Sequence, residues 1–86
     1  MTRYIGIIDG EDGAYGVVFP DLPGCTSAGA TADEAAHNAV DAVSLWVADA
    51  IASGETVPRA RTLAEITADD YAMADVRTGR AALIAV

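Results

Sequence analysis

Carboxylates are the first residues in this sequence whose type and spacing could do chemistry. Four lie close together along the chain and could hold metal ions: Asp9, Glu11, Asp12 and Asp21. Two-metal nucleases need several carboxylates that converge on ions about 4 Å apart. Three of these four fall in one glycine-containing turn, residues 9–13, and the predicted strand interiors carry none. The calcium-loop spacing DxDxDG is also absent. The pattern therefore favours a solvated acidic turn or an acidic surface for a basic partner.

The sequence offers little for acid–base or nucleophilic catalysis. His37 is the single histidine, and we interpret it as a surface residue of a helix, near Asp41. Cys25 is the single cysteine, so it cannot form an internal disulfide, which fits a reducing compartment. We interpret it as a small buried apolar group. No Ser-His-Asp spacing, phosphate loop or zinc pattern is present. We therefore predict a protein that is not an enzyme and that binds no metal or cofactor.

The composition indicates one small acidic domain, residues 1–86. The net charge is −8, 52% of the residues are hydrophobic, and all five basic residues are arginine. Such a charge repels nucleic-acid phosphates and attracts a basic partner over long range. No apolar run approaches the roughly 20 residues of a membrane span, and the N-terminus lacks the apolar region of a signal peptide. We expect a cytoplasmic protein that binds neither membrane nor nucleic acid directly.

Three strands joined by short turns are predicted to position the acidic side chains. Residues 3–9 and 15–19 alternate between two faces, and the glycines of the turn between them supply positive φ angles. A proline ends the second strand, and a weaker third strand follows at residues 25–30. These strands make an antiparallel meander. The rigid PDLPG turn is expected to hold Asp21 and Leu22 out beside the acidic hairpin.

A long helix is predicted next. Thr31 and Glu34 form a capping box, and Gly54 is expected to close the helix in a left-handed conformation. Leu45 lies opposite the apolar stripe and, with Trp46 at the edge of that stripe, is a candidate contact point. The stripe repeats at steps of three and four residues and comprises Ala36, Val40, Val43, Val47 and Ala50.

The last part of the sequence predicts a short helix and a strand. Residues 62–65 open a capped helix that could continue in broken form to Ala74, and residues 81–86 are apolar enough for a strand. The order βββααβ indicates an α+β fold. In it, an antiparallel three-stranded meander plus a C-terminal strand is covered on one face by a long helix and a short helix. The other face and the sheet edges are natural docking surfaces.

Two segments of this sequence together resemble the HicB family of antitoxins. Residues 15–25 read YGVVFPDLPGC, and residues 31–39 read TADEAAHNA. The family's pattern is an aromatic strand with F/Y-P-D-L-P-G-C, a small-residue strand with a glycine, then T-x-x-E-A-x-x-N-A. Residues 54–58, GETVP, also resemble the family's G-x-x-[IV]-P connector. The resemblance covers roughly residues 3–60.

The resemblance implies a partial ribonuclease-H-like fold and a non-catalytic role. HicB antitoxins bind and block HicA, a small basic toxin that cleaves mRNA. Many add a C-terminal segment that binds operator DNA, whereas this sequence ends at Val86. We therefore expect no direct contact of these residues with nucleic acid, and contact with operator DNA only if a C-terminal segment is missing here. The prediction is an antitoxin that binds a HicA-like toxin and forms a homo-oligomer. Its candidate contact residues are Asp9, Glu11, Asp12, Asp21, Leu22 and Leu45.

Two other function classes stay open. One is an orphan structural domain that self-associates through its open sheet face or its C-terminal strand and has no toxin to neutralise. The other is a degenerate ribonuclease-H-like nuclease, whose metal-dependent cleavage would be lost on Asp9→Asn.

Overall fold

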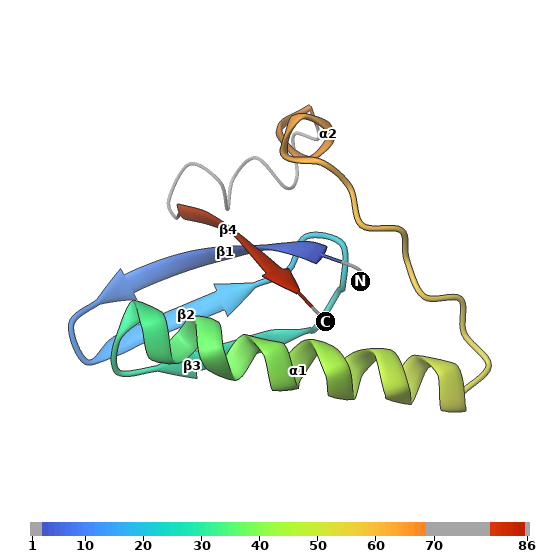
Figure 1. Ribbon diagram of the computed structural model, residues 1–86, viewed down its shortest axis with the longest axis horizontal. Helices are drawn as coiled ribbons and strands as arrows, with labels where there is room; N and C mark the ends of the chain where they lie inside the picture. The colour runs from blue at the N-terminus through green and yellow to red at the C-terminus, as the bar shows by residue number, and fades with distance from the viewer. Residues whose placement is uncertain (1–2, 69–79, 86) are drawn as a thin grey trace.

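The computed structural model describes residues 3–68 and 80–85 of the 86-residue chain (Figure 1). The elements are β1 (Arg3–Glu11), β2 (Ala14–Val18), β3 (Thr26–Gly29), α1 (Ala32–Ala52), α2 (Leu63–Thr67) and β4 (Arg80–Ala85). This order confirms the predicted βββααβ arrangement and the α+β class. The predicted continuation of the second helix to Ala74 lies outside the described residues. Neither helix described is both long and apolar enough to span a bilayer.

The four strands form one antiparallel sheet in the order β3-β2-β1-β4. The C-terminal strand β4 therefore pairs with β1 rather than with its nearest strand in sequence, β3. The hairpin turn is shorter than predicted, because β1 continues until Glu11 pairs with Ala14. Only Asp12 and Gly13 form the turn, and Gly13 has a φ of 89°. Asp9 and Glu11 consequently lie on a strand and not in a flexible loop.

The main core lies between one face of the sheet and α1. Tyr4, Val17 and Phe19 contribute from the sheet side, and their exposed fractions are all below 5%. The buried face of α1 differs from the predicted stripe, since it comprises Ala35, Ala39, Val43 and Ala50. Val40, which we assigned to the stripe, is 38% exposed. Three of these four residues are alanines, and β3 approaches the first turn of α1 closely at Gly29.

The short helix α2 lies against part of the second face of the sheet, at β1. Ile5 and Ile7 alternate with Tyr4 along β1, so their side chains point away from α1. They form a separate buried cluster with Ile66 of α2, which is fully buried. Figure 1 shows α1 and α2 on opposite sides of the sheet. The expectation that both helices cover one face and leave the other open is therefore wrong. Val18, which pairs with Ile7, remains 36% exposed.

Side-chain and glycine caps set the ends of α1, as predicted. The Thr31 hydroxyl accepts a hydrogen bond from the Glu34 N–H at 3.0 Å. The Glu34 carboxylate reaches back one residue further than expected and accepts from the Ala30 N–H at 3.2 Å. At the other end Gly54 has a φ of 74°, and its N–H donates to the Ile51 carbonyl at 3.1 Å.

Candidate functional site

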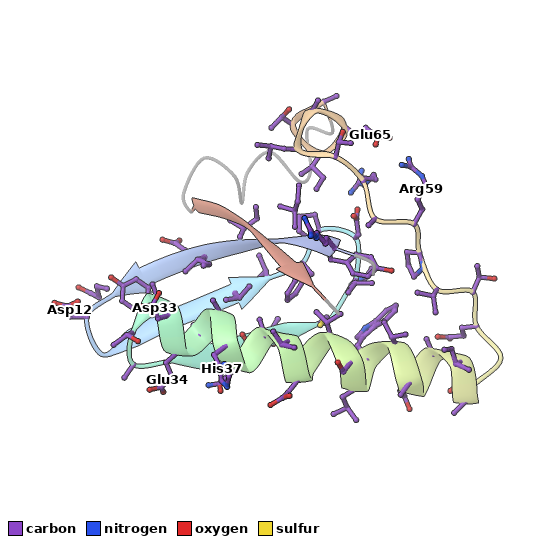
Figure 2. All side chains as sticks on the ribbon, viewed as in Figure 1. Asp12, Asp33, Glu34, His37, Arg59 and Glu65 are labelled. Atoms are coloured by element: carbon purple, nitrogen blue, oxygen red, sulfur yellow. The ribbon has the colours of Figure 1, made fainter. Side chains whose placement is uncertain are left out.

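Three of the four acidic candidates, Asp9, Glu11 and Asp12, gather at one end of the molecule, where the hairpin tip meets the start of α1. Figure 2 shows Asp12 at the same end as Asp33 and Glu34 of the first helical turn. The Gly13 N–H donates to the Ala30 carbonyl at 2.8 Å and holds the tip against the loop that precedes α1. This acidic end comprises the exposed side chains of Asp9, Glu11, Asp12, Asp33 and Glu34. The two ion pairs seen between described residues lie elsewhere.

The four carboxylates first considered as metal ligands are not brought together. Within the described part of the chain, no three His, Cys, Asp or Glu side chains are close enough to hold one ion. Asp21 is separated from the hairpin carboxylates, because it is bound to a different segment. The exposed Asp9 accepts a hydrogen bond from its neighbour's N–H, that of Gly10, at 2.8 Å. The geometry therefore favours a solvated acidic surface over a metal centre.

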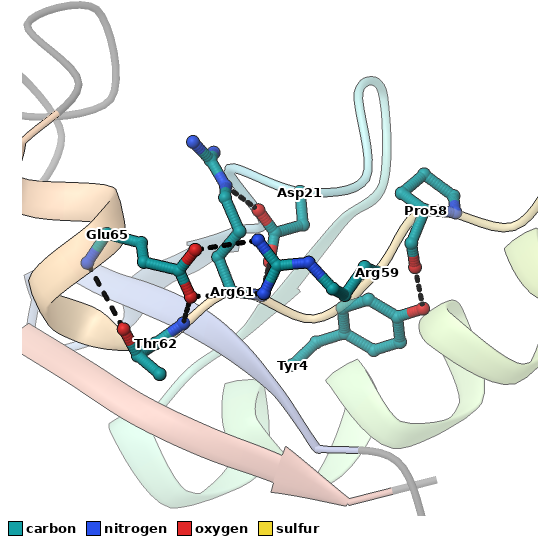
Figure 3. A network of polar contacts seen from close by, with 7 residues as sticks. All are labelled: Tyr4, Asp21, Pro58, Arg59, Arg61, Thr62 and Glu65. Carbon is teal, nitrogen blue, oxygen red and sulfur yellow. Dashed lines mark hydrogen bonds and ion pairs between the residues drawn. The ribbon is translucent and has the colours of Figure 1, made fainter.

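Asp21 is buried, so the expectation that it stands out toward a partner is wrong. Its exposed fraction is 7%. One carboxylate oxygen accepts from the Arg61 backbone N–H at 2.8 Å, and the other accepts from the Arg61 Nε at 2.5 Å (Figure 3). These bonds join segments that are 40 residues apart in sequence. Asp21 therefore fastens the connector after α1 to the turn after β2.

Leu22 is also misplaced by the sequence-based prediction. Its side chain is fully buried and belongs to the main core with Phe19 and Cys25. The Leu22 N–H donates to the Phe19 carbonyl at 3.1 Å, and the Cys25 N–H donates to the Leu22 carbonyl at 2.9 Å. These two bonds tighten the PDLPG turn and direct Leu22 inward. It cannot contact a partner in this fold.

The connector between α1 and α2 is held at further points by a polar network (Figure 3). The Tyr4 hydroxyl donates to the Pro58 carbonyl at 2.6 Å, and burial raises the Tyr4 pKa. Arg59 donates to both carboxylate oxygens of Glu65, at 3.1 and 2.6 Å. The Arg59 hydrogen bonds, followed by the backbone bond at Thr62, lower the Glu65 pKa to about 2. The network fixes the start of α2 above the sheet.

A groove lies between α1 and the segment that leads into β3. Its volume is about 410 Å³, and α1 lines it with Ala42, Leu45, Trp46 and Asp49. Leu45 is 73% exposed, as its position opposite the stripe predicted. The Trp46 Nε1–H donates to the Pro23 carbonyl at 3.0 Å. Leu45 therefore lines a groove together with Ala42 and Trp46, and the sequence alone did not predict this groove.

The two residues considered for catalysis take the positions that were predicted for them. His37 is exposed on the outer side of α1. Cys25 is 4% exposed at the base of the groove, and burial raises the pKa of its thiol. A buried thiol with a raised pKa is a poor nucleophile. Neither residue therefore provides the features of a catalytic group.

Sequence reasoning missed the partner of Asp21 and the groove. Arg61 lies far from Asp21 along the chain, and no spacing rule connects them. The groove depends on how α1 packs beside Gly24 and Thr26. A weak signal existed for the Trp46 side of the groove, because the backbone carbonyl of Pro23 needs a hydrogen-bond donor. That signal says a donor is needed without saying which residue supplies it.

Comparison with known proteins places the chain among antitoxins. The family model described as the HicB-like antitoxin of bacterial toxin–antitoxin systems matches residues 4–80. A UPF0150 protein of Synechocystis sp. is 40% identical over 60 residues, which cover 69% of this chain and 76% of that protein.

Solved structures of antitoxins share the fold. The Burkholderia pseudomallei antitoxin HicB matches with a TM-score of 0.79 and 32% identity, over 100% of this chain and 64% of that one. This chain thus spans less than two thirds of that antitoxin. The N-terminal domain of the same antitoxin matches with a TM-score of 0.77 and 29% identity, over 99% and 98% of the two chains. A HicA3–HicB3 toxin–antitoxin complex matches in fold, with a TM-score of 0.75, 20% identity, and 98% and 96% covered.

The family model covers nearly the whole chain, and the matched span contains the FPDLPGC turn, the capped helix α1 and the connector. The solved neighbours reproduce the same order of strands and helices. This chain therefore belongs to the family of HicB-like antitoxins of bacterial toxin–antitoxin systems.

Proposed function

We propose that this protein is an antitoxin that binds and neutralises a small, basic, mRNA-cleaving toxin of the HicA type. The observation that carries the proposal is the family match over residues 4–80. The likeness to the N-terminal domain of a known HicB antitoxin, over 98% of that domain, supports it. The protein acts by binding and not by chemistry of its own.

The first contact uses the acidic end of the molecule. Asp9, Glu11 and Asp12 are exposed on a hydrogen-bonded hairpin, and the chain carries a net charge of −8. The Arg59–Glu65 ion pair lies at the opposite end (Figure 2). The gathering of exposed carboxylates at the hairpin end gives a basic partner a preferred direction of approach, and electrostatic attraction raises its association rate.

Neutralisation follows from occupation of the toxin's RNA-binding surface. A toxin that cleaves RNA must present basic side chains to phosphates. Carboxylates on a rigid hairpin compete for those same side chains, and the bound antitoxin excludes the substrate sterically. The same negative charge keeps the antitoxin from binding RNA itself. No cofactor or metal is needed for this mechanism.

We also propose that the protein forms a homo-oligomer. Strands β3 and β4 form the two edges of the sheet. An edge strand presents backbone groups that can pair with a further strand. A second copy added along such an edge would give the homo-oligomer that we expected.

The test combines the purified antitoxin with the product of a gene for a small basic protein, which is sought beside the antitoxin's own gene. We expect a stable complex on size exclusion and loss of RNA cleavage at equimolar antitoxin. The variant Glu11→Gln/Asp12→Asn should slow association about threefold to tenfold at low salt, because two steering charges are removed. Asp9 is left unchanged since it also bonds the Gly10 N–H.

The matched control is Glu55→Gln, which is compared with Glu11→Gln alone, because Glu55 is exposed, lies away from the hairpin and does not line the groove beside Leu45. Its association rate should stay closer to that of the unaltered protein. Failure of the unaltered antitoxin to bind the toxin or to block cleavage would disprove the proposed function. Equal slowing by Glu11→Gln and Glu55→Gln would reject the hairpin as the first contact.

A further inference from the structure

We infer that the groove beside Leu45 is the surface that retains the toxin after first contact. It receives an apolar side chain of the toxin that is flanked by lysine or arginine. The inference rests on the proposed function, because it names the surface used by the same partner. It is separate from the acidic end, because the acidic end lies at the start of α1 (Figure 2) and the groove is lined by residues from Ala42 to Asp49.

The groove has one helical wall and one extended wall. Ala42, Leu45, Trp46 and Asp49 have the spacing i, i+3, i+4 and i+7, so they share one face of α1. The facing wall is the short segment from Gly24 to Thr26. The small side chain of Ala42 leaves room between the walls, and the volume of about 410 Å³ accommodates a partner side chain.

The side chain of Trp46, which forms part of the helical wall of the groove, is held in place before any partner binds. The Trp46 Nε1–H donates to the Pro23 carbonyl at 3.0 Å. Pro23 itself lies inside a turn closed by the Cys25 N–H bond to the Leu22 carbonyl, at 2.9 Å. A preorganised wall loses little entropy on binding. Tryptophan is also among the residues that most often dominate interface energies.

The charges around Leu45 identify the partner. Leu45 is 73% exposed, and the exposed carboxylates of Asp41 and Asp49 lie one helical turn before and after it. An apolar side chain between two carboxylates complements an apolar contact rimmed by cations. A second copy of this chain would bring like charges together at Asp41 and Asp49. The charge pattern therefore favours a basic toxin over self-association at this surface.

The groove and the acidic end then have different kinetic roles. Exposed charges mainly change the association rate, whereas well-packed apolar contacts mainly change the dissociation rate. Neutralising Glu11 and Asp12 should act on association. Truncating Leu45 should act on dissociation.

The test compares Leu45→Ala with Ile51→Ala in toxin binding measured by surface plasmon resonance. Ile51 is a matched control, since it is 64% exposed on the same helix but does not line the groove. We expect Leu45→Ala to raise the dissociation rate about tenfold or more, as for an interface hot spot, and to leave association nearly unchanged. Leu45→Arg should weaken binding further by adding a like charge. Ile51→Ala should bind as the unaltered protein does.

Trp46 provides an independent signal, because it is the single tryptophan of the chain. Its emission should shift when the toxin fills the groove. Circular dichroism should show unchanged folding in all three variants, since the altered side chains are exposed.

Each outcome decides between the alternatives. Unchanged dissociation for Leu45→Ala, with normal binding by the unaltered protein, would overturn the groove and leave the proposed function standing. Absence of toxin binding by the unaltered protein would disprove both the proposed function and the role of the groove. If Leu45→Ala instead changes the sedimentation coefficient of the antitoxin alone, a second copy occupies the groove and the toxin does not.

Discussion

Asp21 joins two distant parts of the chain through one carboxylate. Removing a charged group from water costs several kcal/mol unless partners compensate, and here both oxygens accept hydrogen bonds from Arg61. Within the described residues, no buried side-chain nitrogen or oxygen lacks a hydrogen-bond partner. The same connector carries the Pro58 carbonyl that accepts from Tyr4. Single side chains thus hold the connector that carries α2 to its face of the sheet.

The first residue-scale prediction follows from this contact. Asp21→Ala should lower the free energy of unfolding by about 2–3 kcal/mol, because two hydrogen bonds to a charged acceptor are lost. Urea denaturation measures the change. Asp12→Asn is the control, since Asp12 is exposed on the hairpin turn, and it should stay within about 0.5 kcal/mol of the unaltered protein. Equal stability of both variants would show that the Asp21–Arg61 contact does not stabilise the fold.

At the scale of elements, β3 and α1 pack unusually closely at Gly29. A Cβ added there would lie 2.5 Å from the Ala35 backbone nitrogen. Two hydrogen bonds join the same elements. The Ser27 hydroxyl donates to the Ala35 carbonyl at 2.8 Å, and the Asn38 amide donates to the Ala28 carbonyl at 2.9 Å. Gly29 and Asn38, which match the glycine and the asparagine of the family pattern, therefore have structural roles in the packing of β3 against α1.

We predict that Gly29→Ala destabilises the protein by about 1–3 kcal/mol, as overpacking of a close contact does. Thermal unfolding followed by circular dichroism measures this. Gly16→Ala on the neighbouring strand is a matched control. Its added Cβ would meet only the Ser27 carbonyl oxygen, at the ordinary distance of 3.7 Å. A Gly29→Ala variant as stable as the Gly16→Ala variant would show that α1 can move away from β3 at little cost.

At the scale of the whole molecule, charge is distributed unevenly along an elongated shape. The longest extent is 38 Å, several times the Debye length of about 8 Å at physiological salt. The acidic end therefore acts on a partner nearly independently of the Arg59–Glu65 end. The groove lies between them, on the exposed side of α1. A basic partner can be attracted by one surface and retained by another.

This arrangement predicts how toxin binding depends on salt. The association rate should fall on the order of tenfold between ~10 and ~150 mM salt, while the dissociation rate changes much less. Stopped-flow measurement of Trp46 emission follows both rates. Glu11→Gln should show a shallower dependence than the control Glu55→Gln. A dissociation rate as sensitive to salt as the association rate would mean that charge pairs, and not the apolar groove, retain the toxin.

Local chemistry is what the sequence by itself determined. The Thr31 and Thr62 caps, the Gly54 helix end and the PDLPG turn depend on hydrogen bonds between residues a few positions apart. Their patterns are readable without knowledge of the fold. The order of elements followed from them, and so did the family resemblance. The exposed position of Leu45 was predictable as well, because helical periodicity places it opposite the buried stripe.

Only the tertiary structure decided which side chains are covered. Asp21 and Leu22 sit on a turn that predicts exposure, yet Arg61 and the core enclose them. Ala35 and Ala39 lie on the buried face of α1, whereas Val40 is exposed. Ile66 covers Ile5 and Ile7 from the opposite side. Burial depends on segments that are distant in sequence and meet only when the chain folds, so local patterns could not encode it.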